Sequence, residues 1–405
     1  MKSAYKYKID TDSFFDVSLF SYLIFFLLDG SQDSVLIKIG RWGATGLLLL
    51  SGFFLLVGVI HNFRMSMCFV WYSVFCIYAL TSSFWAQDTG AVFELFITFL
   101  RIALVIFFVS IRIRNDDDVR RILDMFKYSV IIRVIVVFIL MIEEVSSTGI
   151  FQYRFGDVVG YNSNSTAVYC VFALLIAIDE THNRGKDKKT YITAIALVLT
   201  ILLSGSKNGI LGVFIGLSLY LLFNNRGTKK IQALVAISII LFIGYEAITT
   251  IPSLYISIGF RFEQMFDTFK GETSGTSTIE RMSLIEKGVT VWKNNKLIGV
   301  GLNNFSVAQN GASIYGGVYA HCNYIELLAD LGIVGILIYY IYPVLICFKY
   351  RTFNSTMRLL KILTIVEMIF DIAMVSYNDI FIVLILSLAY FTQLNQNLKV
   401  NVGSE

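Results

Sequence analysis

His321 is the residue in this sequence that is best placed for proton-transfer chemistry. The chain has three histidines, and His61 and His182 stand in short polar breaks between apolar segments. His321 instead ends the polar stretch 252–320 and begins a new apolar segment, AHCNYIELLADLGIVG. With an unperturbed pKa of about 6.5, a neutral imidazole there can accept a proton from a hydroxyl group. Position alone leaves two alternatives, a catalytic base or an ordinary residue at the start of a helix.

Arg281 is the second candidate, because its neighbours suit a phosphate group. We predict a helix over 278–294, preceded by Ser277 and Glu280 in the spacing of a capping box. Arg281, Gly288 and Trp292 share one face of that helix, since 7 and 11 residues are close to whole turns. A guanidinium beside a small residue and an indole could hold a phosphate with an adjoining sugar. The alternative is a solvated loop arginine.

Two further cations and several polar side chains stand at breaks between apolar segments. Arg154 precedes GDVVGYNSNSTA, in which Asn162 and Asn164 either cap the next helix or bind a polar headgroup. Lys207 lies in SGSKNG, where the amino-terminal N–H groups of a helix would add to its attraction for phosphate.

The residues that follow His321 are also candidate binding residues. Asn323 and Tyr324 come directly after it, and Tyr315 and Tyr319 precede it. The tyrosines either stack on sugars or belong to the aromatic belt of a membrane interface.

The elements that must position these side chains are membrane helices. Hydrophobic residues make up 56% of the chain and charged residues 15%, with a mean hydropathy of +0.70. Soluble domains carry about 25% charged residues, so we predict an all-α polytopic membrane protein. A span needs about 20 apolar residues, and twelve such segments occur, at 13–28, 43–60, 65–83, 91–111, 126–143, 163–180, 190–205, 207–223, 231–250, 325–348, 357–375 and 378–394. The first is expected to be retained and not cleaved as a signal peptide.

The distribution of Lys and Arg predicts the orientation of these spans. Basic residues gather in every second short loop, whereas the intervening short loops hold only Lys38, Arg41, Arg154 and Lys207. The positive-inside rule therefore places both termini in the cytoplasm and the large loop outside. We predict spans 1–9 over 1–250, an external loop with short amphipathic helices over 251–320, spans 10–12 over 321–395 and a cytoplasmic tail over 396–405.

The cysteines and the basic residues argue against a disulfide-rich, a metal-binding or a nucleic-acid-binding protein. The five cysteines show neither a disulfide framework nor metal-ligand spacing, and we predict no metal and no nucleic-acid partner. Glu367 and Asp371 lie inside a predicted span, where a charge is costly and should be paired or face water. They either form internal ion pairs or line a hydrophilic cavity.

Four motifs in order resemble those of the O-antigen polymerase/ligase superfamily. They are RFGDVVGYNSNSTA, LLSGSKNGILG, ERMSLIEKGVTVWKNNKLIGVGLNNF and AHCNYIELLADLGIVG, over roughly 150–345. The resemblance implies a metal-independent GT-C glycosyltransferase, without a cofactor, in the bacterial cytoplasmic membrane. It implies a glycan donor and an acceptor linked to undecaprenyl pyrophosphate, with His321 as base and Arg281 and Lys207 on the pyrophosphate. Lys207 stands where arginine is common, and Cys322 separates His321 from Asn323.

Three functions are compatible with this pattern. The first is a polymerase of O-antigen, capsule or exopolysaccharide repeat units, which could act with a chain-length regulator and a flippase. The second is a ligase that moves a finished polymer to a lipid, as in lipopolysaccharide, or to a protein. The third, from another class, is a transporter of polysaccharide or lipid-linked sugar, which the absence of internal repeats disfavours.

Overall fold

The computed structural model is all-helical over the part of the chain that it describes. It describes residues 10–29, 35–59, 65–145, 153–185, 187–225, 227–252, 276–309, 319–349 and 354–402, with single residues between 255 and 263. The apolar helices are α1 (Thr11–Leu27), α2 (Val35–Val59), α3 (Met67–Thr81), α4 (Thr89–Arg112), α5 (Asp116–Val145), α6 (Ser163–Arg184), α7 (Lys188–Leu203), α8 (Lys207–Asn224), α9 (Thr228–Thr250), α13 (Asn323–Phe348), α14 (Ser355–Phe370) and α15 (Ile380–Val402). The remaining long helix is α12 (Thr276–Asn294).

Each predicted span coincides with one of these apolar helices, so the predicted fold class is confirmed. Among the described residues, eight helical segments are long and apolar enough to cross a membrane: α2, α4, α5, α6, α8, α9, α13 and Met67–Phe84, in which α3 continues into the short 3-10 helix Ser82–Phe84. Helix α1 has 17 residues, and α7 and α14 have 16 each. The apolar part of α15 is limited to Ile380–Thr392. The count of twelve spans therefore stays a prediction.

The chain divides into two compact units. Unit 1 comprises 1–65 and 107–204, and unit 2 comprises 66–106 and 205–405. In unit 1, α1 packs against α2 and α5, and α6 packs against α5 and α7. Helix α6 is the most enclosed of the candidate spans, since 72% of the residues in its most apolar stretch are buried.

The buried Arg133 in unit 1 has several partners for its charge, as a charge inside a membrane span requires. The Arg133 guanidinium donates to the Thr166 hydroxyl at 2.8 Å and to the Leu27 carbonyl oxygen. It also lies 4.9 Å from the centre of the Tyr161 ring, within the range of a cation–π interaction. These contacts replace the water that the charge would otherwise need.

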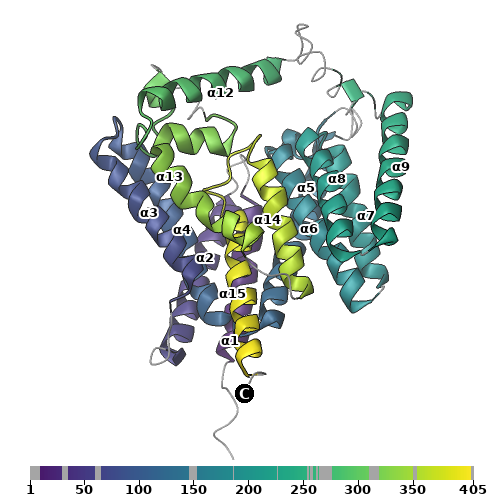
Figure 1. Ribbon diagram of the computed structural model, residues 1–405, viewed down its shortest axis with the longest axis horizontal. Coiled ribbons are helices and arrows are strands. Elements are labelled where there is room, and N and C mark those ends of the chain that lie inside the picture. Colours follow the sequence, from purple (N-terminus) through teal and green to yellow (C-terminus); the bar gives the residue numbers. More distant parts are fainter. Residues whose placement is uncertain are drawn as a thin grey trace, which may run out of the picture. The chain divides into compact units, whose positions relative to one another are not determined.

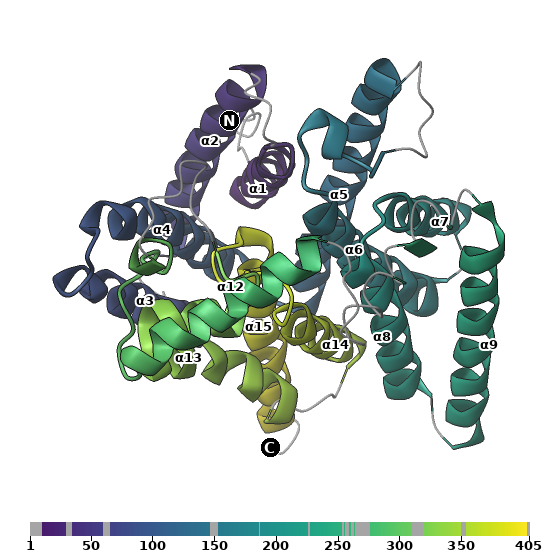
Figure 2. The same ribbon diagram turned by 90° about the horizontal axis from the view of Figure 1, so that it is seen from above.

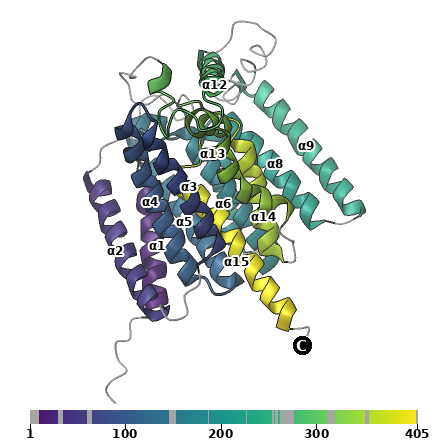
Figure 3. The same ribbon diagram turned by 60° about the vertical axis from the view of Figure 1, so that its left-hand side comes forward.

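Unit 2 contains the helix that carries Arg281 and the helix that follows His321. Helix α12 lies across the amino-terminal end of α13 (Figures 1 and 2), and α13 also packs on α3. Helix α14 contacts α8, α13 and α15. Helices α8 and α9 run side by side (Figure 3). The predicted helix over 278–294 is confirmed as α12.

Helix α13 is broken at Gly332, and the segment 296–301 fills the break. Gly332 has φ 67° and ψ −167°, far from helical values. The N–H groups of Val300 and Gly301 donate to the carbonyl oxygens of residues 329 and 330 at 2.9 and 2.8 Å. A break at membrane depth is tolerated because protein satisfies the freed backbone groups.

Glycine is required on both sides of this junction. A Cβ atom on Gly299 would lie 2.3 Å from the Asp330 carbonyl, and one on Gly332 would lie 2.3 Å from the Leu297 carbonyl oxygen. Both glycines also have positive φ. Gly299 and Gly332 therefore serve one purpose, the close approach of two backbones.

Parts of the predicted external loop lie outside the described residues. These are most of the amphipathic segment 253–271, the hinge up to 275, and Tyr315 in the segment 310–318. The side chains of 276–278, with the predicted cap at Ser277, also lie outside them.

Candidate functional site

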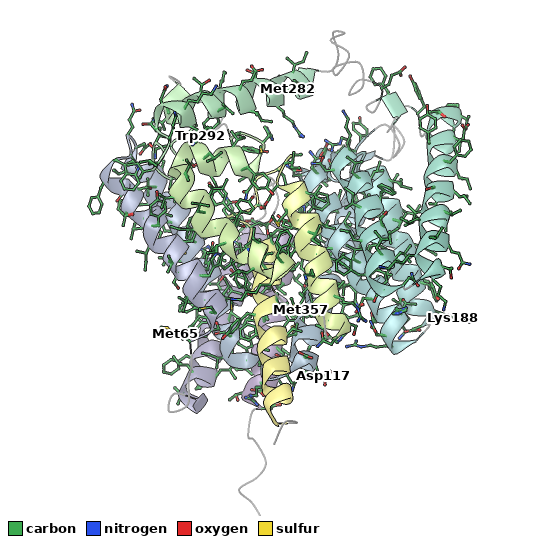
Figure 4. The ribbon with its side chains drawn as sticks, viewed as in Figure 1. Met65, Asp117, Lys188, Met282, Trp292 and Met357 are labelled. Carbon is green, nitrogen blue, oxygen red and sulfur yellow. The ribbon has the colours of Figure 1, made fainter. Side chains whose placement is uncertain are left out.

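Helix α12 is fixed on the start of α13 by a close approach at Gly288. A Cβ atom there would lie 2.4 Å from the Ile325 side chain, so only glycine allows this contact without movement of Ile325. Phe305, Ala320 and Ala329 form a buried cluster against which Ile325 packs. Met282 lies within the first half of α12 and Trp292 near its carboxyl end (Figure 4). The face of α12 that was predicted to carry Gly288 is thus the face that packs against α13.

His321 occupies a strained turn directly before α13. Its φ is 54°, in the left-handed region that non-glycine residues seldom adopt. The residue is half-buried, and its ring centre lies 4.0 Å from that of Tyr319. The Glu326 carboxylate accepts a hydrogen bond from the Ala320 N–H, which holds the residue before His321. Such a conformation persists only where its surroundings impose it.

Burial, and to a smaller extent the positive charge of Arg281, together lower the pKa of His321 to about 4. The imidazole is therefore neutral at pH 7 and has a free lone pair. The Arg281 charge also acts on the neighbouring Tyr319, where burial is the larger effect and raises the phenol pKa. Arg281 thus lies within electrostatic reach of both rings.

The Arg281 guanidinium has no hydrogen bond or ion pair to any other residue that the structure describes. Its side chain is half-buried on the α12 turn that precedes Ile285. Trp292, which was predicted on the same face, donates from its indole nitrogen to the Lys296 carbonyl oxygen at 3.2 Å. The indole thereby ties the end of α12 to the segment that fills the α13 break.

Asn323 and Tyr324 use their polar groups inside the protein. The Asn323 amide oxygen accepts from the N–H groups of Ser376 and Tyr377 at 2.9 and 3.1 Å, and its nitrogen donates to the Tyr340 hydroxyl. Asn323 is fully buried. The Tyr324 hydroxyl donates to the Met368 carbonyl oxygen at 2.7 Å. These contacts assign both residues to holding the turn, and substrate binding by either stays a prediction.

Asp371, directly after the end of α14, is not held by the ion pair that we considered for it. It is 2% exposed, and its carboxylate accepts from the Tyr340 hydroxyl at 2.6 Å and from the Ser376 hydroxyl. Its carbonyl oxygen accepts from the Asn323 N–H at 2.8 Å. Hydroxyl groups therefore take the place of the ion pairs that we considered for Asp371.

Two carboxylates of α13, Glu326 and Asp330, organise the site and were not singled out in the sequence. The Asp330 carboxylate accepts from three successive backbone N–H groups, those of Asn303, Asn304 and Phe305, at 2.7, 3.2 and 2.8 Å. Asn304 in turn bonds to Asp88 before α4, at 2.7 and 3.0 Å. The available signal was a pair of acids one turn apart in an apolar segment, where each should be partnered.

Lys207 is the first residue of α8. The Ser206 hydroxyl caps this helix by accepting from the Gly209 N–H at 3.2 Å. Lys207 is half-buried. It belongs to the same unit as His321 and Arg281.

The remaining predicted site residues lie in unit 1. The Arg154 guanidinium donates to the Ser204 carbonyl oxygen at 2.9 Å and to the Asn164 side chain at 2.8 Å, and it lies 3.3 Å from the Asp157 carboxylate. Asn162 caps α6 by accepting from the N–H groups of residues 164 and 165, so the capping alternative is confirmed for it. A joint site of Arg154 with His321 stays a prediction.

Comparison with known proteins finds one similarity, over part of the chain. Residues 192–340 match the family model Wzy_C, described as O-antigen ligase. No curated protein matches the chain. The matched range contains Lys207, Arg281, Trp292 and His321, and it includes both backbones of the α13 junction, whereas the segment 154–164 lies before it. Over residues 192–340 the chain is thus similar to the O-antigen ligase family, which supports the resemblance to the O-antigen polymerase/ligase superfamily.

Proposed function

We propose that this protein is a polymerase that joins oligosaccharide repeat units carried on undecaprenyl pyrophosphate, at the outer face of the bacterial cytoplasmic membrane. The observation that carries the proposal is the neutral imidazole of His321, held in a strained turn within reach of the Arg281 charge. Both residues lie in the range matched to the O-antigen ligase family.

The reaction is a single displacement at the anomeric carbon of the donor glycan. His321 removes the proton from the acceptor hydroxyl, and the hydroxyl oxygen forms a new bond to that carbon. The bond from the carbon to the pyrophosphate oxygen breaks, its electron pair leaves with the lipid pyrophosphate, and the anomeric configuration inverts. General-base assistance of this kind contributes about 10²–10⁴-fold.

Arg281 and Lys207 stabilise the charge that develops on the leaving pyrophosphate. Preorganised donors at a developing anion are often the largest catalytic contribution. Lys207 supplies a point charge and cannot make the bidentate contact of an arginine. We propose that Arg281 is the principal pyrophosphate ligand for this reason.

Substrate binding would also improve the base. The pKa of His321 is held down by burial and by Arg281. A pyrophosphate beside Arg281 would offset its positive charge and raise the pKa of His321 toward neutrality, where general-base catalysis is most effective. The base would therefore become stronger when the donor is in place.

The test is incubation of the purified full chain in vesicles with a synthetic lipid-linked repeat unit. A ladder of products that differ by one repeat is expected, without added metal or nucleotide sugar. The His321→Ala chain should form no ladder. Absence of a ladder from the wild-type chain, while single units are transferred to another acceptor, would overturn polymerisation.

A ligase is the second candidate, because the matched family carries that description. A ligase would transfer preformed polymer from undecaprenyl pyrophosphate to a lipid or protein acceptor in one step. Supplying long lipid-linked polymer with a lipid A-core acceptor distinguishes the two. A single shift in the mass of the acceptor indicates a ligase, whereas growth of lipid-linked chains indicates a polymerase.

A further inference from the structure

Glu367 is a buried acid on α14 that lacks the partners an ionised carboxylate needs. It is 3% exposed, and neither of its carboxylate oxygens has a hydrogen-bond donor among the described residues. The charged groups that act most strongly on it, Asp371 and Asp379, are themselves acids. A buried charge is stable only where it is paired and hydrogen-bonded. An ionised Glu367 would have no donor and would be repelled by its neighbours.

Asp371 is the group to which a protonated Glu367 would bond. It lies one helical turn further along the chain, within hydrogen-bonding reach of the Glu367 carboxyl group. Two ionised carboxylates cannot bond to each other, because both have only acceptor oxygens. A single proton on the pair removes the repulsion and supplies an O–H donor to the remaining carboxylate. Such charge-assisted hydrogen bonds are among the stronger ones in proteins.

The donors around the pair decide which of the two acids keeps the proton. The Asp371 carboxylate accepts from the Tyr340 hydroxyl at 2.6 Å and from the Ser376 hydroxyl. Hydrogen bonds to the ionised form of a carboxyl group favour that form. The Ser376 hydroxyl also lies near Glu367, but its only proton is donated to Asp371. The proton therefore belongs on Glu367.

The pair is bonded to the turn that holds His321. The Asp371 carbonyl oxygen accepts from the Asn323 N–H at 2.8 Å. The Tyr340 hydroxyl, which donates to the Asp371 carboxylate, accepts from the Asn323 side-chain nitrogen at 2.8 Å. Asn323 follows His321 by two residues. A displacement of Asp371 would therefore be passed on to the start of α13.

We propose that Glu367 and Asp371 form a proton-binding site in which neutral Glu367 donates a hydrogen bond to ionised Asp371 and so positions the His321 turn. The Asp371 carboxylate then accepts from three hydroxyl groups, those of Glu367, Tyr340 and Ser376. Glu367 is a positioning residue and does not touch the substrate. The positioning role rests on the proposed function, because it concerns the rate at which His321 acts, whereas the bound proton does not.

Infrared difference spectroscopy tests the bound proton directly. The full chain is placed in vesicles in heavy water at pH 7, where protonated carboxyl groups absorb at a higher frequency than carboxylates. Subtraction of the Glu367→Gln spectrum from the wild-type spectrum should leave a carboxylic acid band. The matched control is Glu246→Gln, at an exposed acid of α9. Its subtraction should leave a carboxylate band only.

Two spectral results would overturn the proposal. A carboxylate band in place of the acid band at Glu367→Gln would show that Glu367 is ionised. An acid band that disappears in Asp371→Asn but persists in Glu367→Gln would place the proton on the other acid.

Thermal unfolding separates a proton from a metal cation. The melting temperature of the wild-type chain should be the same in sodium, potassium and choline chloride at equal concentration. A melting temperature that rises with sodium or potassium in the wild-type chain, but not in Glu367→Gln, would show that a metal cation occupies the site and would overturn the proposal.

A kinetic arm tests the positioning role. Glu367→Leu cannot donate to Asp371, so it should lower kcat for polymerisation by about tenfold through displacement of the His321 turn, with little change in KM. Glu367→Gln can donate from its amide and should restore most of the rate. A folded Glu367→Leu chain with wild-type kcat would refute the positioning role. The spectra use only the Gln variant, so they still test the site if Glu367→Leu does not fold.

The two proposals fail in different ways. An acid band at Glu367 in a chain that makes no polymer would refute the proposed function but keep the proton-binding site. A carboxylate band at Glu367 in a chain that makes polymer normally would refute the site but keep the function.

Discussion

Arg154 and Arg281 were both predicted to bind an anionic substrate, and the structure gives them very different surroundings. The Arg154 guanidinium is engaged by Asp157, by Asn164 and by the Ser204 carbonyl oxygen. Arg281 has no such contact to a described residue, and its charge acts on the His321 imidazole and the Tyr319 phenol. Arg154 therefore stabilises a turn, whereas the Arg281 charge lowers the pKa of both His321 and Tyr319.

The two helix starts beside these arginines differ in the same way. Asn162 caps α6 with its own side chain. Cys322, at the equivalent position of α13, makes no side-chain cap, and Glu326 instead bonds to the Ala320 N–H before it. The first arrangement is an ordinary cap, and the second imposes an unusual backbone conformation on His321.

Removal of the proposed base should have the largest effect. His321→Ala and His321→Asn should each lower kcat by about 10²–10⁴-fold, because neither side chain accepts a proton at neutral pH. Asparagine tolerates the left-handed conformation, so His321→Asn should fold normally. If His321→Asn restored activity in the polymerisation assay, the imidazole would serve only the turn.

The contrast between the two arginines is tested by matched substitutions. Arg281→Gln should lower kcat by about 10²–10³-fold, as loss of an oxyanion donor does, with an unchanged melting temperature. Arg154→Gln should retain most of its specific activity but lose about 1.5 kcal/mol of stability, because charged hydrogen bonds are removed. Thermal unfolding in detergent measures the stability of each variant, and the polymerisation assay measures its activity. Equal loss of activity in the two folded variants would place Arg154 in the site as well.

The Glu326 contact predicts a smaller, graded effect. Glu326→Ala should lower kcat by up to about 10²-fold through misplacement of His321. Glu326→Gln keeps an oxygen that can accept from the Ala320 N–H, so it should restore most of the rate. The comparison of kcat with KM checks this, since a positioning role leaves KM nearly unchanged. A Gln variant as slow as the Ala variant would indicate that the charge matters and not the hydrogen bond.

The pH dependence should show the smallest change. The acid limb of kcat/KM should fall near pH 4, the pKa of His321 in the free enzyme. Because a lowered histidine pKa leaves the unfolded state with more bound protons between pH 4 and about 6.5, stability should decline as pH falls through that window. Arg281→Gln should move the acid limb upward, since a cation that disfavours imidazolium is removed. An unmoved limb would show that Arg281 does not influence the imidazole.

Much of the fold could be predicted because it follows from local patterns. Long apolar segments predicted the membrane helices, and the cap signature with the glycine face predicted α12. The motifs predicted the family, and the match over 192–340 bears this out. The break at Gly332 was missed because the sequence there is as apolar as the rest of the span. Its hydrogen-bond partners come from the loop segment 296–301, some thirty residues earlier.

The candidate site was predicted less completely, for a related reason. A sequence shows which residues carry charge but not which charges are already paired. Arg154 and Arg281 looked equivalent for that reason, and Asn323 looked free although its amide is buried. Glu326 and Asp330 were not singled out because their partners are backbone N–H groups, which every segment possesses.

The sequence by itself determined the helical membrane architecture, the resemblance to the O-antigen polymerase/ligase superfamily and the position of His321 at the start of a helix. Hydropathy and ordered motifs suffice for that, because both are properties of contiguous residues. Only the tertiary structure decided which polar groups are bonded to other parts of the protein. It placed the Arg281 charge near His321, bonded Glu326 to the turn before α13 and set Gly212 against Phe370. These depend on contacts between distant segments, whose geometry arises only when the helices pack.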